Sequence, residues 1–440
     1  MSPFPVVRSL ADRYRHVRAA TEAWTGSLSD EDCALQSMPD ASPVKWHLAH
    51  TTWFFETFLL SADGGPAGYR AFDPAFRALF NSYYQGVGDR HPRSERGLLS
   101  RPARPEVMRY RRHVDEAMLA WLGAANDAGG LSTQMAERVE LGLQHEQQHQ
   151  ELLLTDLKHL LSCNPTRPIF RPGQRPDGSK PPTGSGGPSA WRSCDGGLAV
   201  QGRDAAPGTF TFDNETPAHR VWLEPFELAE GPVTQGEWLG FIADGGYRRP
   251  ELWLSDGWDL LQRTGWQAPA YWRDVSGGGA PSDLAKPQAW RVFTLHGEVV
   301  PHPDDPVCHV SFFEAEAFAR WAGARLPSEA EWERAAQVGP TPLASEQAQY
   351  ADGHWLQPLA TLSAVPDGSV WCWTRSDYAP YPGFQPASGA LGEYNGKFMN
   401  GQYVLRGGSC ATPRGHLRAT YRNFFPPATR WQFTGLRLAR

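Results

Sequence analysis

Two histidines four residues apart, His145 and His149, are the side chains of this sequence best suited to bind a metal ion. The run around them, residues 135–161, contains no Pro, a single Gly and many Leu, Glu and Gln residues, which predicts a helix. Residues i and i+4 lie on one face of a helix, so both imidazoles can reach the same ion. A further histidine is available from the segment Trp46-His47-Leu48-Ala49-His50 on a second predicted helix. Three imidazole ligands leave coordination positions open, which suits catalysis better than a closed structural zinc site.

The string from His145 to His149 also matches the His-Glu-x-x-His signature of zinc proteases, in which Glu146 would be the general base. The extended signature requires Gly and His three and six residues after the second His. This chain has Leu152 and Thr155 at those positions. A zinc hydrolase is therefore a distant alternative. An exposed histidine pair on a surface helix is disfavoured because the same helix carries apolar faces that predict packing inside a bundle.

The first 162 residues predict a bundle of four helices, because apolar residues recur there at helical spacing. The expected helices cover 10–24, 42–60, a segment opening at Pro105, and 135–161. Ser42 is expected to cap the second helix, with Pro43 as its first residue. Metal sites in bundles are built from inward side chains on facing helices. The long connection over 61–104 is expected to lie over that site.

The composition changes after the fourth helix. Residues 164–190 contain 12 Pro or Gly among 27 residues, which predicts a linker. Beyond it, over 191–440, short apolar stretches alternate with Gly, Pro, Asp and Trp, and only 312–322 and 328–337 look helical. The sequence therefore predicts a helical domain over 1–163 and an irregular α+β domain over 191–440.

Charge and cysteine usage narrow the possible partners and the compartment. The net charge is −6 and the 42 Lys and Arg residues are dispersed, which favours neither nucleic acid nor an anionic membrane as a partner. The chain has no apolar run of about 18 residues and no signal-peptide core at its start. Its six cysteines lie far apart without paired spacing. We expect a cytoplasmic protein with reduced thiols.

The histidine motifs and several C-terminal motifs together resemble a known two-domain family. The first half resembles the DinB-like helical bundle. The second resembles the formylglycine-generating-enzyme (sulfatase-modifying factor) domain, which has a C-type-lectin-like fold. The matching segments are Asn214-Glu215-Thr216-Pro217-Ala218-His219-Arg220-Val221, Pro232-Val233-Thr234, Arg325-Leu326-Pro327-Ser328-Glu329-Ala330-Glu331-Trp332-Glu333, Leu405-Arg406-Gly407-Gly408-Ser409 and Gly435-Leu436-Arg437-Leu438-Ala439. This fusion is characteristic of the iron-dependent sulfoxide synthases of ergothioneine biosynthesis.

The resemblance implies an oxidoreductase with an Fe(II) ion held by His50, His145 and His149. His47 is not carried over as a ligand and is interpreted as a polar residue on the neighbouring helix face. The implied reaction joins sulfur to imidazole C2 of hercynine (Nα-trimethylhistidine), with O2 as oxidant and a sulfoxide as product. Three neutral imidazoles leave the ion its full charge and three open positions. Gln148 resembles the family's contact to hercynine.

The sulfur donor divides this family, and two stretches of the sequence bear on it. Members that use γ-glutamylcysteine carry Trp-Asp and then Arg near the C-terminus, and the corresponding stretch here, 421–429, contains no Asp. The chain instead has Tyr83 and Tyr84, followed by Arg93 and Arg96, which resembles the subgroup that uses free cysteine. There Tyr84, supported by Tyr83, would deliver a proton to reduced oxygen. Arg93, with Arg96, would bind the donor carboxylate, because a guanidinium matches a carboxylate bidentately.

One departure keeps a second donor open. Sequences of this fold usually read Val-Trp-Glu-Trp-Thr, and here Cys372 replaces the Glu. The replacement of this Glu is explained either by structural drift or by a changed donor pocket. Selenoneine synthases, which are close relatives, attach selenium from a selenosugar to hercynine and have less need of a carboxylate clamp.

Hercynine itself is expected in a crevice between the two domains, near Gln148, Asn423 and Phe424.

Two further classes remain open at the level of sequence. A non-catalytic metal-binding bundle joined to a lectin-like recognition domain would keep the histidines and not need Tyr84. A thiol transferase of the DinB superfamily would use zinc and not need O2.

Overall fold

The computed structural model describes residues 9–176, 190–206, 208–277, 281–338, 349–353, 355–360 and 368–440. Its contacts divide the chain into two compact units. The helical unit contains residues 1–163 together with 206–210 and 386–394. The sheet unit contains 164–205, 211–385 and 395–440. Part of the predicted linker, residues 177–189, lies outside the described residues.

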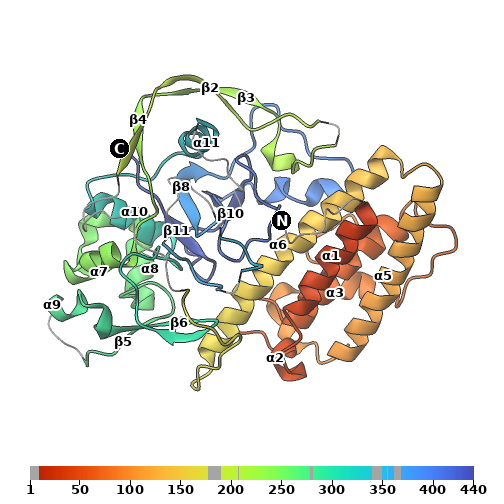
Figure 1. Ribbon diagram of the computed structural model, residues 1–440, viewed down its shortest axis with the longest axis horizontal. Helices are drawn as coiled ribbons and strands as arrows, with labels where there is room; N and C mark the ends of the chain where they lie inside the picture. The colour runs from red at the N-terminus through yellow and green to blue at the C-terminus, as the bar shows by residue number, and fades with distance from the viewer. Residues whose placement is uncertain are drawn as a thin grey trace. The chain divides into compact units, whose positions relative to one another are not determined.

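Four long helices form the helical unit, where they run side by side (Figure 1). They are α1 (Leu10–Ala23), α3 (Val44–Phe55), α5 (Arg104–Asp127) and α6 (Thr133–Cys163). The shorter elements are α2 (Asp30–Ala34), α4 (Phe76–Leu79), the 3₁₀ turns η2 (Arg93–Leu98) and η7 (Ala390–Glu393), and the π-helical η1 (Glu56–Leu60), which extends α3. The four predicted helices are therefore confirmed, each within a few residues of its expected bounds.

The expected cap of the second helix is wrong in detail. Pro43 is the N-cap of α3, and within the described part of the chain no side chain caps this end. The backbone N–H of Ser42 donates to Asp156 Oδ2 on α6 at 2.8 Å, and its hydroxyl accepts from Arg96 at 2.8 Å. Ser42 thus ties the start of α3 to its neighbours, because its hydroxyl oxygen accepts from the charged Arg96 guanidinium and its backbone N–H donates to the Asp156 carboxylate.

The sheet unit is built from short strands in several small sheets, as the sequence predicts for an irregular α+β domain. The largest sheet has the order β10-β9-β8-β11, with β8 and β11 parallel and the other pairs antiparallel. Two two-stranded sheets, β1-β4 and β2-β3, and the three-stranded β5-β6-β7 complete the described set. The strands are β1 (Trp191–Cys194), β2 (Gly197–Gln201), β3 (His219–Leu223), β4 (Phe226–Ala229), β5 (Trp272–Asp274), β6 (Trp290–Thr294), β7 (Gly297–Val299), β8 (Trp371–Asp377), β9 (Tyr403–Arg406), β10 (Asn423–Phe425) and β11 (Thr434–Leu436).

Both helices predicted in the second half are present, as α10 (Phe312–Trp321) and α11 (Glu329–Val338). The expectation that no others occur there is wrong, because α7 (Gln235–Ala243), α8 (Ser255–Thr264) and α9 (Pro281–Leu284) are also helical. Glycines and a tryptophan lower the helix propensity of α7. A capping box between Thr234 and Glu237 and the burial of Trp238, Leu239 and Phe241 override that preference. The short 3₁₀ turns of this unit are η3 (Asp213–Glu215), η4 (Gly246–Arg248), η5 (Pro250–Leu252), η6 (Pro287–Ala289) and η8 (Gly396–Phe398).

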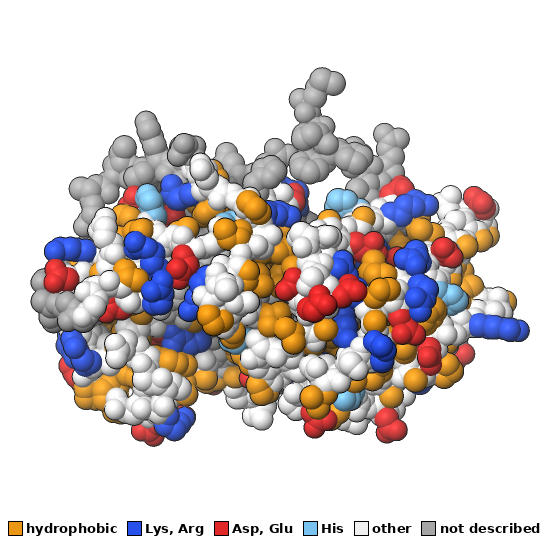
Figure 2. All heavy atoms as spheres, turned by 90° about the horizontal axis from the view of Figure 1, so that it is seen from below, with side chains coloured by type: hydrophobic (Ala, Val, Ile, Leu, Met, Phe, Trp, Pro, Cys, Tyr) orange, Lys and Arg blue, Asp and Glu red, His pale blue; other side chains and the backbone are white. Residues whose placement is uncertain are grey.

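The surface shows mixed charge. On the face drawn in Figure 2, acidic and basic side chains are interspersed with apolar ones. No helix among the described residues is long and apolar enough to cross a membrane. Both units bury titratable side chains, and the predicted histidine triad lies in the interior of the helical unit.

Candidate metal centre

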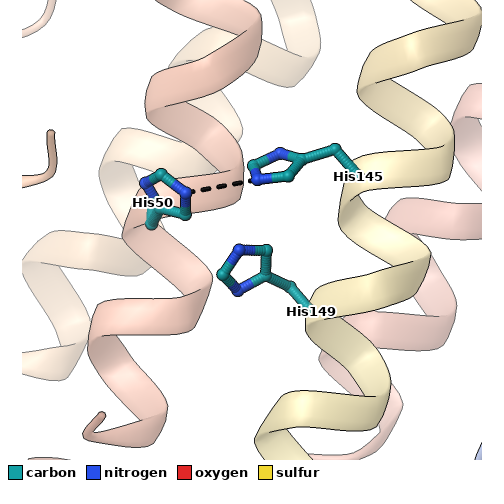
Figure 3. Close-up of side chains that lie close together, drawn as sticks. All are labelled: His50, His145 and His149. Atoms are coloured by element: carbon teal, nitrogen blue, oxygen red, sulfur yellow. Dashed lines mark hydrogen bonds between the residues drawn. The ribbon is translucent and has the colours of Figure 1, made fainter. Parts of the chain in front are cut away.

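His50, His145 and His149 converge inside the helical unit. His50 comes from α3 and the other two from α6, and their rings point toward one another (Figure 3). One ligand nitrogen from each lies within 4.8 Å of the others. The Nε2 atoms of His50 and His145 are 3.3 Å apart. The i,i+4 spacing therefore places the α6 pair on the face that meets α3, as the sequence predicts.

The His50 ring is fixed from several sides. Its Nδ1 is 2.7 Å from the carbonyl oxygen of Phe80, which can only accept, so Nδ1 carries the proton and Nε2 has the lone pair. Trp46 stacks on one side of the ring with centroids 4.5 Å apart, and Trp53 stacks at 5.5 Å. Both the orientation and the tautomer of His50 thus suit metal binding through Nε2.

Burial keeps the three imidazoles in the form that binds metals. Desolvation lowers the pKa of His145 to about 3. Desolvation and the neighbouring histidines lower the pKa values of His50 and His149 well below their ordinary value. Protonated imidazoles cannot coordinate a cation, whereas neutral ones can. Three convergent, neutral nitrogen donors therefore fit a divalent transition metal with open coordination positions.

His47 lies against this triad, contrary to its interpretation as a polar residue on a neighbouring helix face. It is buried, with its Nδ1 2.9 Å from His149 Nδ1 and its Nε2 3.1 Å from Asp156 Oδ2. A signal for this existed in the spacing. His47 precedes His50 by three residues, and Asp156 follows His149 by seven, so each pair shares one helix face.

Glu146, which the protease signature would use as a general base, points away into an ion-pair network. Its carboxylate accepts from Arg18 at 2.9 Å and from Arg111 at 3.1 Å, and all three side chains are buried. Burial opposes ionisation of this carboxyl, yet the two guanidinium groups outweigh it and lower its pKa. A carboxylate engaged in this way stabilises the bundle and is not positioned to activate water at the triad, so the zinc-hydrolase alternative loses its base.

Tyr83 and Tyr84 lie in the same unit as the triad, in the long connection between η1 and α5. Tyr84 is fully buried, and its ring centroid is 5.6 Å from Trp53 and 5.1 Å from Phe58. Its hydroxyl is 3.5 Å from the Tyr83 hydroxyl. Burial, with a contribution from Tyr83, raises the pKa of Tyr84 well above its ordinary value. The phenol therefore stays protonated and can donate a proton.

A third tyrosine, which the sequence analysis did not identify, lies beside the triad. Tyr394 belongs to the 386–394 segment of the helical unit, and its ring contacts His145 edge-on at 5.6 Å. Its hydroxyl donates to Gln148 Oε1. The adjacent Glu393 accepts from the backbone N–H groups of Gln85 and Gly86 at 2.9 and 2.7 Å. No local pattern indicates these contacts, because Tyr394 and Gln148 lie 246 residues apart and Glu393 and Gln85 lie 308 apart.

The two predicted arginines differ in their surroundings. Arg96 is buried, and its guanidinium carbon lies 3.3 Å from the centroid of the Trp46 ring that stacks on His50. Desolvation and the neighbouring Arg93 lower the pKa of Arg96. Arg93 is exposed and donates to the carbonyl of Asp40. Of the two predicted arginines, Arg96 is therefore the one that the fold buries next to the histidine triad.

The remaining predicted residues belong to the sheet unit. Asn423 and Phe424 lie on β10, where Phe424 stacks on Tyr378 at 3.9 Å. Cys372 lies on β8, opposite Arg406 of β9 and Gly435 of β11. Burial raises the pKa of its thiol to about 12, so Cys372 is a protonated core residue.

Each half of the chain matches a known protein family. Residues 13–153 match the DinB superfamily, and residues 188–364 and 367–440 match the sulfatase-modifying factor enzyme 1-like domain. The chain is 37% identical to a hercynine oxygenase of Mycobacterium tuberculosis, with 93% of each chain covered. It is 33% identical to the hercynine oxygenase of Mycolicibacterium thermoresistibile, covering 93% of this chain and 90% of the relative. PvdO from Pseudomonas aeruginosa, a solved structure, covers 57% of this chain and 93% of its own at 20% identity, with a TM-score of only 0.35.

Fold and site together define a DinB-like bundle with a buried histidine triad, fused to a formylglycine-generating-enzyme-like domain. The chain belongs to the hercynine oxygenase family, the sulfoxide synthases of ergothioneine biosynthesis, and is an oxidoreductase. The predicted family, fold class and enzyme class are thereby confirmed.

Proposed function

We propose that this enzyme uses Fe(II) and O2 to join a donor thiol to imidazole C2 of hercynine, with cysteine as the donor and hercynylcysteine sulfoxide as the product. One observation carries the proposal. A buried triad of neutral histidines lies in a chain that matches hercynine oxygenases over 93% of its length. A donor set of three nitrogens without a carboxylate suits a borderline metal such as iron better than Mg²⁺ or Ca²⁺.

The reaction balances with O2 as the only oxidant. The C2–H bond of hercynine and the S–H bond of cysteine break, and one C–S bond forms. One oxygen atom becomes the sulfoxide oxygen, while the other leaves as water with the two released protons. O2 thereby accepts four electrons, two for the C–S bond and two for the sulfoxide. When bound, the iron would supply the site for activating O2 and for holding the thiolate.

The chain's own residues would hold the reactants and supply a proton. His50, His145 and His149 would be the iron ligands. Gln148, on the same helix, would contact hercynine, and we propose Asn423 and Phe424 as further contacts from the sheet unit. Tyr84, supported by Tyr83, would donate the proton that reduced oxygen requires, because its buried phenol stays protonated at neutral pH.

The proposal that cysteine is the sulfur donor requires a cationic side chain that binds the cysteine carboxylate. Arg96 is the favoured anchor because it is buried beside Trp46, whereas Arg93 is exposed and would serve as an outer contact. A selenosugar is the alternative donor, which would make the enzyme a selenoneine synthase. The sequence feature that favours it is Cys372 in place of the usual Glu.

The proposal is tested by loading the full-length protein anaerobically with Fe(II) and measuring O2 uptake with hercynine and cysteine, followed by mass analysis of the product. We expect O2 uptake that requires both substrates and a product with one C–S bond and one added oxygen. Zinc-loaded protein is the control and should consume no O2. Activity with zinc and without O2 would instead support a thiol transferase. Metal binding without any turnover would support a non-catalytic bundle.

A further inference from the structure

A chain of polar contacts connects the metal triad to a buried carboxylate. Asp156 Oδ2 accepts from the backbone N–H of Ser42 at 2.8 Å and lies 3.1 Å from His47 Nε2. The other nitrogen of His47, Nδ1, lies 2.9 Å from His149 Nδ1. His47, Asp156 and Ser42 are all buried, so water does not compete for the two bonds to Asp156, whereas the His47–His149 contact is partly buried. The contacts join α3 to α6 and end at a residue of the triad.

Hydrogen-bond chemistry allows only one arrangement of protons that also permits metal binding. An ionised carboxylate has acceptors only, so His47 must donate to Asp156 from Nε2. A neutral His47 then has its lone pair on Nδ1 and accepts a hydrogen bond from His149 Nδ1. His149 in turn keeps its lone pair on Nε2, which is the nitrogen left to bind a metal.

We propose that His47 and Asp156 are positioning residues that fix the tautomer and orientation of His149 and pass carboxylate charge to it. The inference rests on the metal site and not on hercynine chemistry. In this proposal the group that orients the His149 ring differs from the groups around the other two histidines. His50 is oriented by the neutral carbonyl of Phe80, and His145 Nδ1 has no hydrogen-bond partner within the described residues.

The proposed support has an electrostatic consequence. Three neutral imidazoles do not offset the charge of a divalent ion, and no carboxylate belongs to the triad of the described residues. Asp156 supplies a negative charge, and a single side chain, His47, lies between it and His149. A hydrogen bond that passes this charge to His149 makes its ligand nitrogen more basic, and removal of such outer partners typically weakens metal affinity about 10- to 100-fold.

Metal affinity and the ligand-field spectrum of Co(II) test the proposal without turnover. Co(II) is titrated into metal-free wild type and into the variants His47→Leu, His47→Gln and Asp156→Asn. The Leu variant removes the chain of contacts, whereas Gln supplies an amide that can donate to Asp156 and accept from His149. The Asn variant keeps an acceptor for Ser42 and His47 but removes the charge. His159→Leu is the matched control, since His159 lies on the same helix and contacts Ser37 Oγ at 2.7 Å.

We expect His47→Leu to weaken Co(II) binding about 10- to 100-fold and to shift the Co(II) absorption bands, with partial recovery in His47→Gln. Asp156→Asn should weaken binding less than His47→Leu, and His159→Leu should match wild type. Wild-type affinity and spectrum in both His47→Leu and Asp156→Asn would overturn the proposal. If wild type itself binds no Co(II), the metal site and this inference both fail. Wild-type binding with unaffected variants would overturn only the inference.

A measurement on wild type covers the case in which the His47 or Asp156 variants do not fold. The ¹⁵N shifts of the imidazoles in histidine-labelled, metal-free protein report which nitrogen carries the proton. We expect His149 to be protonated on Nδ1 and His47 on Nε2, with the His149 signals assigned by their loss in His149→Gln. A His149 ring protonated on Nε2 would overturn the proposal.

Discussion

Tyr394 donates a hydrogen bond to Oε1 of Gln148, and these residues are 246 positions apart in the chain. The contact brings a phenol to the helix that carries His145 and His149, and the Tyr394 ring lies 5.6 Å from His145. Gln148 is therefore held by a tyrosine before any substrate binds. Two buried or partly buried phenols, Tyr84 and Tyr394, are thus candidates for the proton donor that the proposed chemistry requires.

We expect Tyr84→Phe to retain hercynine affinity and to lose C–S bond formation or to oxidise the donor instead, because the variant removes only the hydroxyl whose proton would be transferred. Tyr394→Phe should change hercynine affinity as well, since it removes the hydroxyl that donates to the Gln148 oxygen. Product ratios by mass analysis, together with hercynine calorimetry, separate the two effects. An unchanged rate and product ratio in Tyr84→Phe would move the role to Tyr394 or Tyr83.

Replacing any of the three triad histidines with alanine should remove the metal and abolish turnover while the fold is retained. Two imidazoles cannot hold a divalent ion with the affinity of three, and the alanine leaves no replacement donor. Iron is measured by elemental analysis and folding by circular dichroism. His159→Ala, on the same helix, is the control and should keep one iron per chain. Full iron occupancy in His50→Ala would show that the third ligand is misassigned.

The donor should be a small thiol or selenol and not γ-glutamylcysteine. The dipeptide carries a second carboxylate, and the 421–429 stretch contains no Asp to build the Asp/Arg couple that serves dipeptide-using relatives. An unpaired buried carboxylate costs several kcal/mol, which lowers kcat/KM by orders of magnitude. The measurement is a competition between cysteine, γ-glutamylcysteine and a selenosugar at fixed hercynine and O2.

A preference for γ-glutamylcysteine in that competition would contradict the prediction. A selenosugar preference of about a hundredfold, equivalent to about 2.7 kcal/mol in transition-state binding, would identify a selenoneine synthase. Arg96→Gln distinguishes the donors further. It should raise KM for cysteine because the carboxylate loses its buried cation, whereas a selenosugar without a carboxylate should be less affected.

Glu146→Gln should destabilise the protein by up to about 3–5 kcal/mol, because it removes the buried carboxylate that Arg18 and Arg111 share. Each guanidinium then keeps only a more exposed partner, Asp115 for Arg18 and Glu22 for Arg111. Folded Glu146→Gln should still bind one metal ion. Urea denaturation and metal analysis measure the two quantities. Glu140→Gln is the matched control, because the Glu140–Arg13 pair is partly exposed and should contribute less than about 1 kcal/mol. Loss of turnover in Glu146→Gln without loss of stability would instead support a general base.

The metal-free protein should lose stability as the pH falls below about 6.5. The unfolded chain protonates its histidines near that pH, whereas folded His145, with a pKa of about 3, stays neutral. Each such histidine lowers the free energy of unfolding by about 1.4 kcal/mol per pH unit between the two pKa values, and contributes nothing above about pH 7. Urea denaturation at about pH 7 and pH 5.5 measures the slope. His145→Gln should flatten it, and an identical slope in that variant would contradict the prediction.

The sequence by itself predicted the helices of the bundle and the histidines that α3 and α6 bring together. These features depend on local periodicity, since i,i+4 spacing and apolar recurrence determine which side chains share a helix face. Motif similarity likewise predicted the second domain, because its segments are distinctive strings. Helix propensity did not predict α7, because its capping box and the burial of its aromatic residues outweigh the cost of its glycines.

The tertiary structure decided which side chains meet across the chain. His47 and Asp156 are 109 residues apart, Glu146 and Arg18 are 128 apart, and Gly86 and Glu393 are 307 apart. The first two contacts satisfy buried polar groups, whereas the Gly86–Glu393 contact is exposed. Burial makes a partner obligatory without specifying from which element it comes. The partner is selected by how the helices and the 386–394 segment pack, and that packing has no counterpart in local spacing. For this reason the histidines that converge at the candidate metal site were predictable from sequence, whereas for His47 and Asp156 helix spacing gave only the face and not the partner.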